Sequence, residues 1–116
     1  MKQNDPKYLP TDAGLMHEDG YIVPLDEPCM ILRGKDVGAL LAIVEYIEML
    51  EDQPQAMPTI ISHSQSASER LLAFYNYQID NPHLQSVGCS QRSHVDTIYI
   101  IERARHKLRG LGVIER

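Results

Sequence analysis

Short apolar runs separated by turn-forming residues occupy the first third of the chain. Leu15–His17 and Tyr21–Val23 flank the turn 18–20, whose Asp-Gly pair is a hairpin signal because glycine tolerates positive φ. Cys29–Leu32 is a further apolar run, short enough for a buried strand. Residues 1–10 have no apolar period and contain two prolines, so we expect an extended arm. The pattern predicts a hairpin and one more strand.

Apolar positions at helical spacing begin at residue 37. Asp36 is the expected N-cap, because its carboxylate can accept a hydrogen bond from a free N–H group of the first turn. The apolar positions cover more than one stripe, a pattern typical of a helix that is central in the fold or shared with another subunit. They are Val37, Leu40, Leu41, Val44 and Ile47, widened by Ile43, Tyr46, Met49 and Leu50.

Two further helices are predicted by capping boxes. The second helix begins at the box 66–69 and ends at Asn81, and residues 59–61 before it form a short strand or a buried loop. The third begins at the box 93–96 and ends near Gly110 and Gly112. The inward-facing residues are predicted to be Leu71, Leu72, Phe74, Tyr75 and Ile79 in the second helix, and Val95, Ile98, Tyr99, Ile101, Ala104 and Leu108 in the third.

This order of elements predicts an α+β fold, with a small N-terminal antiparallel sheet (hairpin plus one strand) packed with three helices. The 116 residues, 43% hydrophobic and 23% charged, match a single domain over residues 1–116. The core of so short a chain is modest, so we expect a homo-oligomer. No apolar run is long enough to span a bilayer, and the polar N-terminus lacks the apolar segment of a secretory signal. With only Cys29 and Cys89, a cytoplasmic location with free thiols is expected.

The charge is divided unevenly along the chain. The net charge is −5, with −7 in residues 1–52 and +2 in residues 53–116. An acidic chain does not attract nucleic-acid phosphates, so nucleic acid is not an expected partner. One interpretation is a solvated acidic helix edge together with a basic helix end; the other is electrostatic pairing between subunits. The acids of that edge are Glu45, Glu48, Glu51 and Asp52, and the bases of that end are Arg103, Arg105, His106, Lys107 and Arg109.

Catalytic and metal chemistry have weak support in the sequence. The candidate metal ligands follow no compact spacing, so no metal or other cofactor is expected; they are His17, Cys29, His63, His83, Cys89, His94 and His106. No pair of carboxylates is placed for acid–base work. Cys89, which precedes a helix start and lies near Arg92 and His94, is a candidate nucleophile with a lowered pKa. Free cysteine is more often a packing residue, so we expect no enzyme.

The residues before two of the predicted helices give the best-supported candidate site, which is a site for anions. Arg33 and Lys35 precede the first helix, and Ser90–His94 precedes the third. Free N–H groups and the helix dipole favour anions at such positions, and arginine adds fork-shaped donors. The alternative is that Arg33 and Lys35 pair with the acidic helix edge or with a neighbouring molecule.

Tyrosine dominates the aromatic content. Six of the seven aromatic residues are Tyr, and Tyr75 and Tyr77 are two positions apart, so both cannot face one core from one helix. At least one of them is expected at a wet or shared surface, for an interface or for stacking on a base. The predicted ligand-binding residues are therefore Arg33, Lys35, Tyr75, Tyr77, Ser90, Arg92, Ser93 and His94.

The segment 27–36, Glu-Pro-Cys-Met-Ile-Leu-Arg-Gly-Lys-Asp, resembles a pattern in small accessory proteins of tailed bacteriophages. In that pattern a proline and a short apolar strand are followed by Leu-Arg-small-x-Asp and a helix. The match departs at Val37–Leu40, where an Ala-Pro pair is common in the family. The resemblance implies a phage or mobile-element origin, and action by binding inside the host cytoplasm.

These observations favour a non-enzymatic binding protein, of the kind that sequesters an anionic small ligand such as a nucleotide immune signal. The first alternative is an inhibitor or adaptor that binds a host protein, favoured by the wide apolar helix and the uneven charge. The second alternative is a small enzyme with Cys89 as its nucleophile. The expected partner is an anionic small molecule or a host protein, and no membrane.

Overall fold

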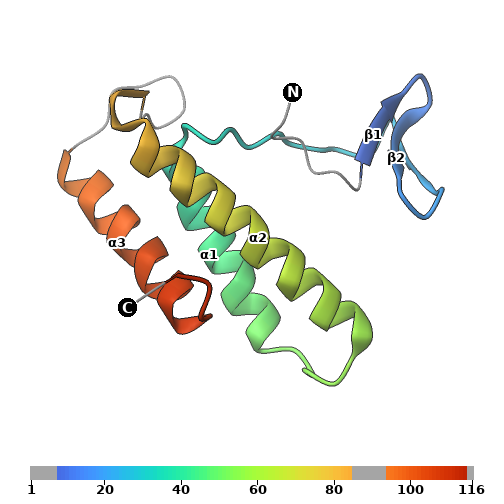
Figure 1. Cartoon of the computed structure of the whole chain (residues 1–116). Coiled ribbons are helices and arrows are strands. Elements are labelled where there is room, and N and C mark those ends of the chain that lie inside the picture. Colours follow the sequence, from blue (N-terminus) through green and yellow to red (C-terminus); the bar gives the residue numbers. More distant parts are fainter. Residues whose placement is uncertain (1–7, 85–93, 115–116) are drawn as a thin grey trace. The chain divides into compact units, whose positions relative to one another are not determined.

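The computed structural model describes residues 8–84 and 94–114. The chain divides into two compact units, Met1–Ile31 and Leu32–Arg116, called here the sheet unit and the helical unit. A three-stranded antiparallel sheet precedes three helices, which confirms the predicted α+β class (Figure 1). Each unit is described by itself.

The sheet unit is a meander of three short strands. They are β1 (Tyr8–Thr11), β2 (Gly14–His17) and β3 (Ile22–Pro24), in the order β1-β2-β3. The predicted hairpin is β2–β3, in which Leu15 lies opposite Val23. Its turn relies on Gly20, which has φ of +94° and donates its N–H to the carbonyl of His17. The structure therefore confirms the hairpin that the Asp-Gly pair predicts.

The third strand is not the one predicted. Cys29–Leu32 lies outside any strand, and Met30 and Ile31 are 79% and 89% exposed. The sheet is completed by β1, which contains residues 8–10 of the predicted arm. A tight local turn makes this pairing accessible, because only Asp12 and Ala13 separate β1 from β2. Short closures cost little chain entropy.

Gly14 is required where this turn meets the sheet. Its φ is +131°, and a Cβ there would lie 2.0 Å from the carbonyl oxygen of Val23. The Thr11 hydroxyl donates to the Gly14 carbonyl at 2.6 Å and accepts from the Ala13 amide at 3.2 Å. The turn is therefore held by one side chain, and it admits no side chain at residue 14.

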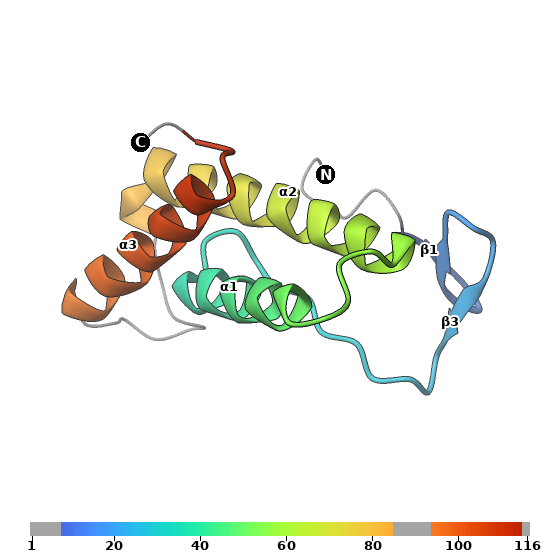
Figure 2. The same ribbon diagram turned by 90° about the horizontal axis from the view of Figure 1, so that it is seen from below.

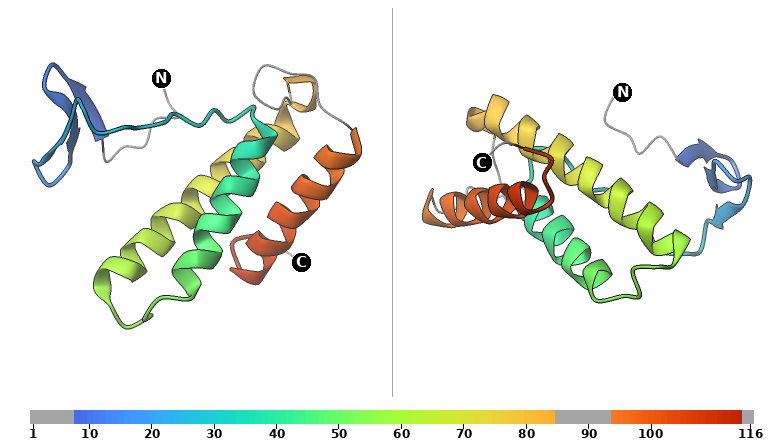
Figure 3. Two further views of the ribbon diagram at one scale, coloured as in Figure 1. Left: turned by 180° about the vertical axis from the view of Figure 1, so that it is seen from behind. Right: turned by 60° about the horizontal axis from the view of Figure 1, so that its bottom comes forward.

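The helical unit consists of α1 (Val37–Glu51), α2 (Pro58–Asp80), the short 3-10 helix η1 (Pro82–Leu84) and α3 (His94–Gly110). α1 packs against both α2 and α3, so of the two uses expected for its wide apolar surface, the central position is observed (Figure 3). α2 runs antiparallel to α1, and its end lies at the same end of the unit as the starts of α1 and α3 (Figure 2). The largest fully buried apolar side chains are Val37, Leu40, Val44, Ile47, Leu71 and Leu108.

Side chains and turns close the ends of α1 and α3. The predicted N-cap is confirmed, since Asp36 Oδ1 accepts from the Gly38 amide at 2.9 Å. At the other end of α1, Gln55 Nε2 donates to the carbonyls of Leu50 and Glu51 at 2.8 and 3.1 Å. α3 ends in a Schellman turn at Gly112, whose φ is +76°. These contacts satisfy groups that every helix terminus leaves open.

α2 starts earlier than predicted, at Pro58, so residues 59–61 are helical and Ser66 is an internal residue. Proline suits the first helical position, where its missing N–H would have no partner in the helix. Ile60 then packs against the core, so the added turns bury apolar surface. The Ser66 box matched the local pattern but did not mark the start, because helix extension from Pro58 costs little once the helix is nucleated.

Most of the predicted inward-facing residues of α2 and α3 are buried, namely Leu71, Phe74, Tyr75, Ile101, Ala104 and Leu108, but three are not. Ile79, Ile98 and Tyr99 were expected inside but are 43%, 52% and 63% exposed. Gln78 and Thr97 are buried instead. Gln78 is held because its Nε2 donates to the carbonyl of Gly34 at 2.5 Å, which joins α2 to the turn before α1. One polar contact therefore outweighs the apolar periodicity at this end of α2.

Replacing Leu40 tests whether α1 is the centre of the core. Leu40→Ala removes a fully buried side chain and should lower the free energy of unfolding by about 2–5 kcal/mol. Tyr46→Ala on the same helix removes a side chain that is 48% exposed and should cost less than about 1 kcal/mol. Urea denaturation measures both. Equal losses for the two variants would contradict a core centred on this face of α1.

Candidate functional site

Three of the predicted ligand-binding residues lie at one end of the helical unit. Arg33 is exposed and Lys35 half-buried in the turn before α1. This turn packs on α2, where a Cβ placed on Gly34 would lie 3.3 Å from Cδ1 of Tyr77. Arg33, Lys35 and Tyr77 are thus brought to the same end of the unit. Asp36 adds a carboxylate there and already accepts from the Gly38 amide, so this helix start offers an anion less than its sequence suggests.

Tyr75 serves the contact between α2 and α3. Its side chain is buried, and its hydroxyl accepts a hydrogen bond from Arg105 Nε at 2.7 Å. Arg105 also pairs with Glu102 one turn earlier on α3. The prediction that at least one of Tyr75 and Tyr77 faces away from the core agrees with the half-buried position of Tyr77. Tyr75 therefore contributes to packing and does not join the group at Arg33.

The remaining predicted residues come from the start of α3 and from the segment before it. Ser90, Arg92 and Ser93 lie outside the described residues, as does Cys89, the candidate nucleophile. His94 is the first residue of α3. Within residues 8–84 and 94–114, no group of three or more His, Cys, Asp or Glu could hold a metal ion.

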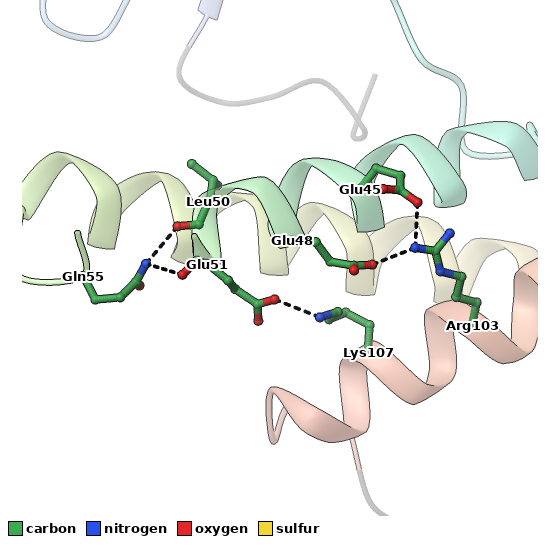
Figure 4. A network of polar contacts seen from close by, with 7 residues as sticks. All are labelled: Glu45, Glu48, Leu50, Glu51, Gln55, Arg103 and Lys107. Atoms are coloured by element: carbon green, nitrogen blue, oxygen red, sulfur yellow. Dashed lines mark hydrogen bonds and ion pairs between the residues drawn. The ribbon is translucent and has the colours of Figure 1, made fainter. Parts of the chain in front are cut away.

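The acidic edge of α1 pairs with the basic end of α3 (Figure 4). Arg103 Nη2 lies 2.6 Å from Glu45 Oε1 and 2.8 Å from Glu48 Oε1. Lys107 Nζ lies 2.9 Å from Glu51 Oε1. One turn along α3 thus matches one turn along α1, so the two helices run parallel. These bonds, led by the one to Glu45, raise the pKa of Arg103 above its ordinary value.

This ladder of ion pairs contains three of the eleven acids of residues 1–52. Glu48 and Glu51 stand in the last turn of α1, where the helix dipole disfavours negative charge, and Glu45 lies one turn earlier. The bases of α3 compensate them only when the helices run parallel. The sequence left open whether these charges meet solvent or another subunit, and three of the acids are instead paired within the chain.

No protein-family model, no curated protein and no solved structure matches this chain. The resemblance of residues 27–36 to bacteriophage accessory proteins therefore stays a prediction. Among the described residues, none of the helices combines the length and the apolar character that a membrane span requires.

The sheet unit carries an aromatic cluster that the sequence analysis did not single out. His17 stacks on Tyr21 with ring centroids 4.7 Å apart, and Tyr8 meets His17 edge-on at 5.0 Å. The Asp19 amide donates to His17 Nδ1 at 3.2 Å and fixes the ring beside its turn. Because side chains alternate along strands, Tyr8 and His17 share a face of the sheet with Pro10, Leu15 and Val23.

An open hollow of about 420 Å³ lies in the sheet unit, beside the same face. Pro10, Leu15 and Val23 line it from the strands, and Glu27, Pro28 and Cys29 line it from the segment that follows β3. The Glu27 amide donates to the Pro24 carbonyl at 3.1 Å, so a turn holds this segment next to the sheet. The hollow is lined mainly by apolar groups, and Glu27 is its charged lining residue.

The charge of the sheet unit is one-sided. Between Tyr8 and Ile31 the chain contains five carboxylates and neither lysine nor arginine. The same stretch exposes large apolar side chains; those at least 40% exposed are Leu9, Tyr21, Ile22, Leu25, Met30 and Ile31. A charge count over residues 8–31 alone would have indicated this surface. The count over residues 1–52 combines its five acids with the paired acids of α1.

A double-mutant cycle tests the ladder of ion pairs. Glu51→Gln, Lys107→Met and their combination should give a coupling of about 0.2–1 kcal/mol in low salt, since the pair is partly exposed. The coupling should fall toward zero in 1 M NaCl, where the Debye length is about 3 Å. Urea denaturation supplies the four free energies.

A matched cycle uses Glu69→Gln, an exposed acid on α2, in place of Glu51→Gln. It should give no coupling with Lys107→Met at either salt concentration. A coupling equal to that of Glu51 would show a general charge effect, and no coupling for Glu51 in low salt would contradict the pairing.

Proposed function

We propose that this chain is a non-catalytic protein-binding adaptor or inhibitor, and that the sheet unit provides its docking surface. The observation that carries the proposal is the coincidence, within residues 8–31, of exposed apolar side chains with an unbroken excess of carboxylates. Soluble domains do not usually gather apolar side chains on so small an element unless something covers them. The charge excludes like-charged partners and favours basic ones.

The helical unit supplies a scaffold in this proposal. Its buried side chains come from all three helices, and its charged groups include the ion pairs between α1 and α3. The helical unit also exposes apolar side chains, Ile98 and Tyr99 among them, but it contains lysine and arginine beside its acids, so the one-sided charge is a property of the sheet unit. Self-association remains a prediction, which the mass in solution tests.

The proposal is tested by comparing two surface variants as bait in a lysate of the cells that encode the protein. Met30→Ser combined with Ile31→Ser removes the two most exposed apolar side chains of the sheet unit. Capture of the partner should fall at least about tenfold, the effect of losing about 1.4 kcal/mol of binding free energy.

The matched control is Ile98→Ser combined with Tyr99→Ser, which removes exposed apolar side chains of α3. It should capture the partner as the unchanged chain does, and the partner should be recovered with unaltered mass. Equal capture by both variants, or a loss with the α3 variant alone, would overturn the proposal.

An anionic small ligand held by Arg33 and Lys35 is the second candidate function, favoured by the packing of their turn against Tyr77. A panel of cyclic nucleotides should then raise the Tm of the unchanged chain, and Arg33→Ala should abolish the rise without lowering the Tm of the free protein. Absence of any rise, or a rise that survives Arg33→Ala, would exclude this candidate.

A further inference from the structure

We infer that the hollow of the sheet unit binds one lysine or arginine side chain of a partner protein. This inference rests on the proposed function and assigns the chemistry of the docking site. The hollow is walled on one side by the strand residues Pro10, Leu15 and Val23 and on the other by the segment that contains Glu27 and Pro28. The occupant is therefore a group with an apolar part for the strands and a polar part for Glu27.

The shape of the site favours a long side chain. A volume of about 420 Å³ that is open to solvent admits a flexible stem entering from a partner surface. Lysine and arginine cover apolar surface with their methylene stems while the charged head stays at the rim, where water and a carboxylate are both within reach. A purely apolar occupant would leave Glu27 at the hollow without a charged partner.

The charge around the hollow selects the sign of the head group. Glu27 lines the hollow, and the described part of the sheet unit contains neither lysine nor arginine that would compete for it. Asp12, Glu18, Asp19 and Asp26 add negative potential from the same unit. A cation is therefore attracted both by the carboxylate at the wall and by the field of the whole unit. An acidic side chain would meet repulsion from each of these groups.

The aromatic cluster extends the same face beyond the hollow. Tyr8, His17 and Tyr21 lie next to Pro10, Leu15 and Val23 at one end of this face, and Tyr21 is 53% exposed. Residues that flank the basic side chain in the partner can pack on these rings, because Tyr offers contact area at a small cost in side-chain entropy. The face thus fits an extended basic segment, with its lysine or arginine in the hollow.

The experiment uses the full chain and three probes that share one four-carbon apolar scaffold: n-butylammonium, n-butanol and butyrate. NMR titration follows the methyl resonances of Leu15 and Val23, which line the hollow. We expect the affinity to fall in the order cation, neutral probe, anion. The inference would be overturned if the cation and the alcohol bound with equal affinity, or if no probe shifted these methyl resonances.

Glu27→Gln should weaken binding of n-butylammonium by about two- to fivefold, the range for a solvent-exposed ion pair, and leave n-butanol unchanged. The matched control is Glu18→Gln, which removes one charge from the same unit at a residue that does not line the hollow. It should change the affinity for the cation much less. Equal effects of the two variants would assign the selectivity to the overall field and contradict a role for Glu27.

The two proposals fail in distinguishable ways. If the probes show no preference for the cation while Met30→Ser with Ile31→Ser still abolishes capture of the partner, the hollow is not a basic side-chain site and the sheet unit remains the docking surface. If the probes bind as expected but capture is independent of the sheet-unit variant, the hollow binds cations and the proposed function is wrong.

Discussion

The burial of α1 between two helices is the constraint on which the helical unit depends. Its buried positions face both α2 and α3, which explains why its apolar pattern is wider than a single stripe. A helix that must bury two faces needs a partner on each. The acids on its remaining edge agree with the direction of α3, because Arg103 and Lys107 meet Glu45, Glu48 and Glu51 only in a parallel arrangement. Burial sets the packing, and the partly exposed ion pairs add a smaller contribution that favours this orientation.

The parts of the fold that could be predicted are those governed by local signals. The Asp-Gly turn gave β2–β3, Asp36 gave the start of α1, and the two glycines after residue 109 gave the end of α3. The prediction was wrong where two segments could each have formed the same strand. Cys29–Leu32 has the composition of a strand, yet β1 pairs with β2 through a turn that Thr11 and Gly14 define. Amino-acid composition alone therefore does not determine which short segment pairs with β2.

The candidate site was less predictable than the fold, because it depends on which side chains share a surface. Tyr75 and Tyr77 are only two positions apart on α2, yet their side chains have different surroundings. Tyr75 is buried and accepts a hydrogen bond from Arg105, whereas Tyr77 packs beside Gly34. The aromatic face of the sheet brings Tyr8 and Tyr21 to His17, and this depends on strand pairing that no single-residue signal encodes. The sequence does show that residues 8–31 contain neither lysine nor arginine. This observation indicates an acidic surface only because the structure places those residues in one unit.

In the function proposed for this chain, binding takes place on the sheet unit while the helical unit is a scaffold. Hydrogen–deuterium exchange of the full chain, alone and with the purified partner, distinguishes the roles of the two units. We expect slower exchange in segments covering residues 8–31 and unchanged exchange in α1, whose amides are already protected by the core. Slower exchange confined to residues 33–36 and 94–110, with none in residues 8–31, would contradict it.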